Sequence, residues 1–223
     1  MWPYVCQMAL IRSAYQDELD GVSQSLVDLT NLVTASIVKA SKAIQSADLT
    51  LAEEVIASDL KIDDLQHELD ARIIDIIARQ QPVATDLRAL VTAMRMSADL
   101  ERMGDLAHHI AKVARLRHPD SAIPAPLMLP FTEMGHVAEK LSIMVAAVIT
   151  TRDTEMALQV EKDDDEMDDL HKKVIATIIK DENGLSLESA IDLTLLGRYY
   201  ERYADHAVSV ARRVYFLVTG TFA

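Results

Sequence analysis

The sequence is poor in the residues that make turns and cross-links. Its 223 residues include six glycines, six prolines and one cysteine. Average usage is roughly 7 % glycine, or about sixteen residues in a chain of this length, so this backbone seldom needs a positive φ or a tight turn. The lone cysteine, Cys6, cannot form a disulfide within the chain, which excludes a disulfide-stapled fold and fits a reducing compartment. Long helices are the expected structure.

The sequence also lacks positive charge and long apolar runs. Lys and Arg number 22 against 35 Asp and Glu, a net charge of −13, which disfavours binding to nucleic acid or directly to an anionic membrane. No window approaches the roughly 20 uncharged apolar residues of a transmembrane helix. The apolar segment 1–10 is short and has no basic start, so it is not a typical secretory signal. We therefore expect a soluble, cytoplasmic protein in which residues 1–10 are an N-terminal extension without a role in the fold.

The prolines divide the chain into two halves. Proline inside a helix costs on the order of 3 kcal/mol, so prolines mark helix starts and connections. Pro82 interrupts one helical run, and four of the six prolines lie in a linker at 119–130. We predict an all-α fold of two tandem antiparallel three-helix bundles, one over 11–118 and one over 131–223. The expected helices span 13–47, 50–80, 84–117, 128–151, 154–180 and 186–218.

The two halves are copies of one another. The segment IDDL at 62–65 returns as MDDL at 167–170, an offset of 105, and LERMGD at 100–105 returns as YERYAD at 200–205, an offset of 100. The repeat therefore covers the second and third helices of each half.

The negative charge lies in two blocks at equivalent places in these copies. Seven acidic residues and one lysine lie between Glu53 and Asp70, and nine acidic and two basic residues between Arg152 and Asp169. The rest of the chain is neutral overall, so the net charge is a property of the second helix of each half.

An apolar stripe on the third helix predicts that two carboxylates point inward. Its members recur at alternating steps of three and four residues, which is typical of one buried helix face. Glu101 and Asp105 continue the stripe. A buried charge costs several kcal/mol unless it is paired or coordinated, so both carboxylates need a cation. The stripe consists of Leu87, Val91, Met94 and Ala98.

Pairs of acids at the same spacing occur on the second and third helices of both halves. The i, i+4 spacing puts each pair on one helix face, about 5–6 Å apart. Four carboxylates from two neighbouring helices suit Mg²⁺, Mn²⁺, Ca²⁺ or oxidised iron, and suit zinc less well without His or Cys. The candidate metal ligands are Asp59, Asp63, Glu101 and Asp105 in the first half and Asp164, Asp168, Glu201 and Asp205 in the second.

Other interpretations of these acids remain open. An acid pair is more often a solvated helix face, and nearby arginines such as Arg102 and Arg202 could neutralise the glutamates. Recurrence of both pairs in both halves favours an ion site. His109, one turn after Asp105, could add a nitrogen ligand, although its counterpart is Ser209. Four further histidines are predicted to be surface or capping residues, namely His108, His118, His136 and His171.

Several common enzyme motifs are missing from the sequence. The sequence has no CxxC, no HExxH and no Gly-rich phosphate loop, and it lacks the pair of Glu-x-x-His motifs that di-iron bundles carry on two helices. A carboxylate-bridged metal enzyme acting on phosphate or oxygen, and a purely structural helical scaffold, are the alternatives to a non-enzymatic regulator.

Two tandem three-helix repeats, each with Glu-x-x-x-Asp on its third helix, resemble the PhoU family of phosphate-uptake regulators. The similarity covers about residues 12–218 and is strongest in QPVATDLRALVTAMRMSADLERMGDLAHHIAKVARLRHP and DLTLLGRYYERYADHAVSVARRV. The resemblance implies a cytoplasmic accessory protein of the phosphate-specific ABC transporter. Such a protein represses the phosphate-starvation (Pho) regulon when phosphate is plentiful.

The resemblance also implies partners and a cofactor. The expected partners are the transporter ATPase subunit and a sensor histidine kinase, through which alone the protein reaches the membrane, and a second copy in a homodimer. The repeated acidic motifs would carry metal, as multinuclear iron or, alternatively, as Mn, Mg or Zn.

Overall fold

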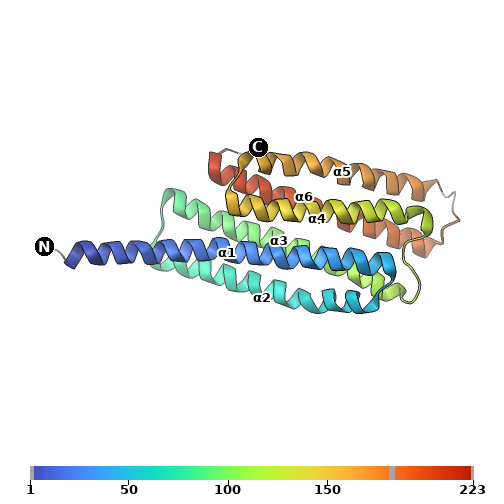
Figure 1. The fold of residues 1–223 in the computed structure, drawn as a ribbon, viewed down its shortest axis with the longest axis horizontal. Helices are drawn as coiled ribbons and strands as arrows, with labels where there is room; N and C mark the ends of the chain where they lie inside the picture. Colours follow the sequence, from blue (N-terminus) through green and yellow to red (C-terminus); the bar gives the residue numbers. More distant parts are fainter. Residues whose placement is uncertain (1–2, 181–183, 222–223) are drawn as a thin grey trace.

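Six helices make up the computed structural model, which describes residues 3–180 and 184–221. Figure 1 shows them as two antiparallel three-helix bundles lying side by side, and no strand occurs in the part of the chain that is described. The predicted all-α fold is confirmed. The helices are α1 (Pro3–Ser46), α2 (Leu49–Gln80), α3 (Ala84–Arg117), α4 (Ala125–Thr151), α5 (Thr154–Ile179) and α6 (Leu187–Thr219).

Two helices begin earlier than the sequence predicts. Helix α1 starts at Pro3, so residues 3–10 continue the first helix instead of preceding it. Helix α4 starts at Ala125, within the expected linker, with Pro124 as its N-cap, Pro126 in its first turn and Pro130 further inside it. Proline is tolerated in a first turn because its missing N–H has no intrahelical partner there, which explains why a helix begins within the proline cluster.

Matching caps fix the register of the two acidic helices. The Asp48 side chain accepts a hydrogen bond from the backbone N–H of Leu51 at the start of α2. At the start of α5, Asp153 accepts from Glu155 and Met156. An aspartate N-cap stabilises a helix start by satisfying N–H groups that have no intrahelical partner. Since Asp48 and Asp153 are 105 residues apart, as are the acid pairs, each pair lies at the same distance from its cap.

The two bundles share one core. Helix α2 packs on α1 and α3, helix α5 packs on α4 and α6, and the α1–α4 and α3–α6 contacts join the bundles. The acidic helices α2 and α5 therefore lie on opposite outer sides of the molecule (Figure 1). No helix among the described residues is both long and apolar enough to cross a membrane.

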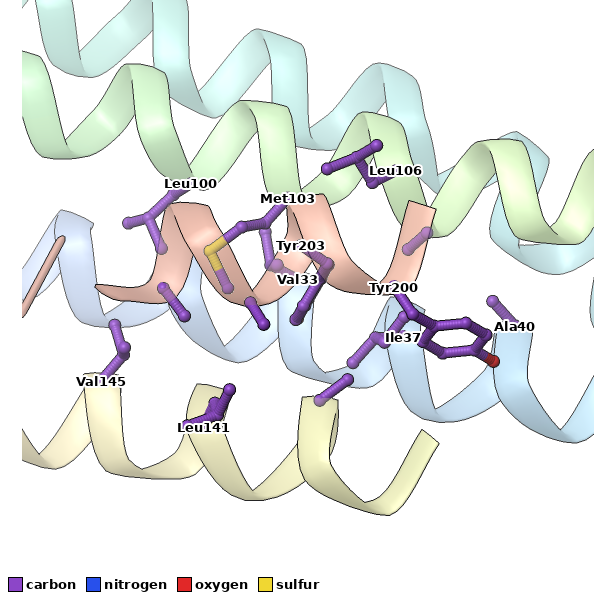
Figure 2. Close-up of a cluster of buried hydrophobic side chains, with 14 of the residues drawn as sticks. Val33, Ile37, Ala40, Leu100, Met103, Leu106, Leu141, Val145, Tyr200 and Tyr203 are labelled. Atoms are coloured by element: carbon purple, nitrogen blue, oxygen red, sulfur yellow. The ribbon is translucent and has the colours of Figure 1, made fainter. Parts of the chain in front are cut away.

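Two tyrosines lie where the bundles meet. Tyr200 and Tyr203 on α6 are fully buried and stand where the first repeat has Leu100 and Met103 (Figure 2). The Tyr200 hydroxyl is 2.9 Å from Ser41 Oγ on α1, and the Tyr203 hydroxyl is 2.6 Å from Ser142 Oγ on α4. Burial raises the pKa of both phenols, and the serine partners satisfy their hydroxyls.

Candidate metal sites

The apolar stripe on α3 does not face the core. Leu87 and Val91 are 39 % and 40 % exposed, whereas Leu90 and Leu100 on another face are fully buried. The prediction of an inward-facing stripe is wrong because α3 contacts three helices, α1, α2 and α6. Three neighbours cover most of its circumference, so apolar residues recur on several faces and the stripe is the part left uncovered.

Glu101 and Asp105 consequently lie at a rim and not in the core. Both continue the uncovered stripe, and both are partly buried, beside α2. Gly104, which lies between Glu101 and Asp105 in the sequence, lets α2 approach α3 closely. A Cβ on Gly104 would lie 3.0 Å from two carbon atoms of Ile62 on α2. Ile62 is next to Asp63, so this close approach brings the acid pairs of the two helices toward each other.

The first acidic site comprises Asp59 and Asp63 on α2 and Glu101 and Asp105 on α3. Burial raises the pKa of Glu101, and the carboxylates of Asp105, Asp63 and Asp59 raise it further. The pKa of Asp63 is raised by burial and then by Asp59 and Asp105. The four predicted residues are therefore near enough to repel one another, and the site carries more negative charge than its surroundings neutralise.

The second acidic site comprises Asp164 and Asp168 on α5 and Glu201 and Asp205 on α6. Burial, followed by repulsion from Asp205, Asp168 and Glu201, raises the pKa of Asp164 to about 7. The pKa of Glu201 is also raised, by burial and then by Asp205. The structure thus brings the second predicted set together as it does the first.

Arginines neutralise these sites only in part. Arg102 lies 3.5 Å from Glu101 and 2.8 Å from Asp105, and Arg198 binds Glu201. Both arginine side chains are more than half exposed, and the pKa values of Glu101 and Glu201 stay raised despite them. Exposed ion pairs contribute little, so room remains for a stronger cation.

Asp99, a partly buried carboxylate outside the two sites, is neutralised more fully by neighbouring side chains. Asp99 on α3 accepts hydrogen bonds from Ser209 and Arg213 on α6 and is 3.1 Å from Nδ1 of His206. Burial alone would raise the pKa of Asp99, but these partners outweigh it and hold the pKa below its ordinary value. Glu101 and Asp164, whose pKa values are raised, differ from Asp99 in this respect.

His108 joins the first acidic site, which the sequence analysis missed. Its Nδ1 contacts Oδ2 of Asp59, its side chain is 15 % exposed, and its Nε2 is buried with no hydrogen-bond partner. The expectation of a surface or capping residue is wrong here, although His118, which contacts the carbonyl oxygen of Ala47, fits it. The available signal was that His108 follows Asp105 by three residues, which puts the two side chains on neighbouring parts of one face.

His109 turns toward the other repeat. Its ring stacks on Tyr199 of α6 at 5.2 Å between centroids, and its Nδ1 is 2.8 Å from the backbone carbonyl oxygen of Asp105. These contacts place the His109 side chain at the α3–α6 boundary.

The donor chemistry of both sites fits a hard cation. Their side chains supply carboxylate oxygens, the ligands that Mg²⁺, Mn²⁺ and Ca²⁺ prefer. The raised pKa values of Glu101 and Asp164 reflect burial and then repulsion, and a bound cation would relieve the repulsion. In the conformation described, no three His, Cys, Asp or Glu side chains are already grouped to hold one ion, within residues 3–180 and 184–221. Ligation therefore requires side-chain rotation, including movement of Arg102 and Arg198 off the glutamates.

Comparison with known proteins finds a repeated match to one family. The family model described as PhoU domain matches twice, at residues 26–114 and 131–214. A relative from Mycobacterium tuberculosis (strain ATCC 25618 / H37Rv), called "Phosphate-specific transport system accessory protein PhoU homolog 2", is 43 % identical over 212 residues, which are 95 % of this chain and 100 % of the relative. Homolog 1 from the same strain is 36 % identical over 94 % of this chain and 95 % of its own length.

A solved structure also shares the fold. The crystal structure of PhoU from Pseudomonas aeruginosa superposes with a TM-score of 0.85 at 27 % identity, covering 93 % of this chain and 100 % of that one.

Proposed function

The chain belongs to the PhoU family, and on that premise we propose that it is a non-enzymatic accessory protein that restrains phosphate uptake. The observation that carries the proposal is the match of both repeats to relatives named as accessory proteins of phosphate-specific transport, over nearly the whole of both chains. When phosphate is plentiful, the protein holds down uptake and represses the phosphate-starvation regulon.

The proposed mode of action is protein–protein contact. The cytoplasmic partners are the ATPase subunit of the phosphate ABC transporter and a sensor histidine kinase, and the regulator works as a homodimer. The structure offers long, outward-facing acidic helices, α2 and α5, on opposite sides of one shared core. Contacts made on either side can therefore act on the same packed unit.

Metal binding at the two acidic sites is the second part of the proposal. Repetition of all four carboxylates and the raised pKa values of Glu101 and Asp164 support it. Bound metal, as multinuclear iron or as Mn, Mg or Zn, would supply positive charge that ties the paired helices together. The side chains on α2 and α3, or on α5 and α6, would supply the oxygen ligands.

Gene deletion tests the regulatory role. In a source strain with no second gene of this family, deletion should raise phosphate-starvation gene expression in high-phosphate medium, and the wild-type gene should restore repression. Unchanged expression after deletion would contradict the proposal. Turnover of a phosphoester or peroxide by the metal-loaded protein would instead favour the metal enzyme.

A further inference from the structure

The first acidic site contains a polar atom that the protein leaves without a partner. His108 lies on α3, one turn beyond Asp105, and its Nε2 is buried without a hydrogen bond. Its other ring nitrogen, Nδ1, contacts the carboxylate of Asp59 on α2. Buried polar atoms are almost always paired, so an exception calls for a specific reason.

This arrangement is typical of a metal-binding histidine. Such a residue ordinarily donates one ring N–H to a carboxylate, which fixes the tautomer and directs the lone pair of the other nitrogen to the metal. With the proton on Nδ1 and Asp59 as its acceptor, Nε2 of His108 carries a free lone pair. The pairing also limits rotation of the ring, since Asp59 and His108 are both largely buried.

The second repeat has no such residue. One hundred residues after His108 the chain has Val208, a buried apolar side chain. Asp164, the counterpart of Asp59, is surrounded by the carboxylates of its own site. The two sites therefore share their oxygen donors, but among the described residues only the first has an imidazole in contact with one of its carboxylates.

We propose that Nε2 of His108 is a metal ligand, oriented by Asp59, which makes the first site a mixed nitrogen and oxygen site. The second site has no imidazole paired with the counterpart of Asp59, because its histidine, His171, lies one turn beyond Asp168 and near Glu201. Imidazole suits zinc, iron, nickel and copper, whereas carboxylates alone suit Mg²⁺, Ca²⁺ and Mn²⁺. The first site consequently prefers Zn²⁺ or Fe²⁺ more strongly than the second does. This inference rests on the proposed metal binding.

The experiment isolates each site in the full-length chain. E201Q/D205N leaves only the first site, and E101Q/D105N leaves only the second. Zn²⁺ and Mn²⁺ dissociation constants are measured by competition with a chromophoric chelator. The ratio of Zn²⁺ to Mn²⁺ affinity should be at least about tenfold higher for the first site than for the second.

Substitution of His108 then distinguishes a metal ligand from a purely structural partner of Asp59. In the E201Q/D205N background, H108V should lower Zn²⁺ affinity by about tenfold or more and leave Mn²⁺ affinity within about threefold. H108N keeps a donor near the position of Nδ1 for Asp59 but has no Nε2, so it should lose Zn²⁺ affinity as H108V does. H109V is the matched control, because His109 faces Tyr199, and it should change neither constant.

The reverse exchange and a spectroscopic signature complete the test. V208H in the E101Q/D105N background should raise Zn²⁺ affinity, and circular dichroism checks that each variant is folded. Zinc K-edge X-ray absorption of E201Q/D205N with one equivalent of Zn²⁺ should show imidazole scattering that H108N removes.

Two failures have different meanings. If the wild-type chain binds neither Zn²⁺ nor Mn²⁺, metal binding itself is overturned, and this inference with it. If both metals bind but H108N retains the zinc affinity and the imidazole signal, His108 is a structural partner of Asp59 and only this inference is overturned.

Discussion

The two acidic sites occupy equivalent places in a duplicated fold, yet their surroundings differ. In the first, His108 contacts Asp59, and Arg102 reaches both Glu101 and Asp105. In the second, a valine replaces the histidine and the pKa of Asp164 is raised to about 7. The two repeats thus share an aspartate N-cap followed by acids at fixed intervals along the helix. The side chains that neutralise those acids have diverged.

The largest expected effect is the loss of metal from one repeat at a time. E101Q/D105N and E201Q/D205N each remove two oxygen donors and should each abolish binding at one site, while the combined variant should bind no metal. Plasma mass spectrometry after dialysis against Mn²⁺ measures the metal content per chain in the two double variants and in the combined variant.

The matched control uses the neighbouring acids Asp64 and Asp169, which are repeat equivalents and exposed. D64N and D169N should keep the wild-type metal content. Undiminished metal in either site-directed double variant would remove the corresponding residues from the ligand set.

A second prediction concerns the pH dependence of stability without metal. An aspartate in the unfolded chain titrates near about 3.9, whereas the pKa of Asp164 in the fold is about 7. Between these values the folded state binds more protons than the unfolded state, so stability falls as the pH rises through that window. In EDTA, D164N should raise Tm at pH 8 by a few degrees and change it little at pH 4.

The first repeat supplies the comparison for this effect. D59N replaces the carboxylate that contacts His108 with an amide, whose oxygen is a weaker acceptor, and should give no gain in Tm at pH 8. Thermal melts across the pH range measure both variants, and a D164N profile parallel to that of the wild type would contradict the assigned pKa.

Much of this architecture could be predicted from the sequence, because its signals are local. Proline positions, cap residues such as Asp48, and i, i+4 spacing of acids all act within one or two helical turns. The repeat offsets then located equivalent residues without any knowledge of packing.

The orientation of α3 could not be predicted. Apolar residues occur around most of this helix because three helices pack on it, so the spacing of Leu87 and Val91 did not reveal which face is uncovered. The contact of His108 with Asp59 joins residues 49 positions apart, and it depends on the α2–α3 approach at Gly104. Such contacts arise from packing between helices, and the periodicity of a single helix gives no information about them.

The smallest expected effect is the loss of one tyrosine hydroxyl from the shared core. The second repeat has Tyr200 and Tyr203 there, where the first has Leu100 and Met103 (Figure 2). Y200F leaves Ser41 Oγ without its tyrosine partner. In Y203F, Ser142 Oγ still donates to the carbonyl oxygen of Ala138. A buried group left unsatisfied costs about 1–3 kcal/mol, against about 0.5–1.5 kcal/mol for an ordinary hydrogen bond, so Y200F should destabilise the protein more than Y203F.

Urea denaturation of the two variants measures this difference, and S41A provides the control. The double variant Y200F/S41A removes both polar groups, so it should recover part of the stability that Y200F loses. Equal losses for Y200F and Y203F, with no recovery in the double variant, would mean that the tyrosines stabilise the junction by ring packing alone. The hydroxyl pairs would then add nothing to the stability of the shared core. The two repeats would differ there only in the size and shape of the packed side chains.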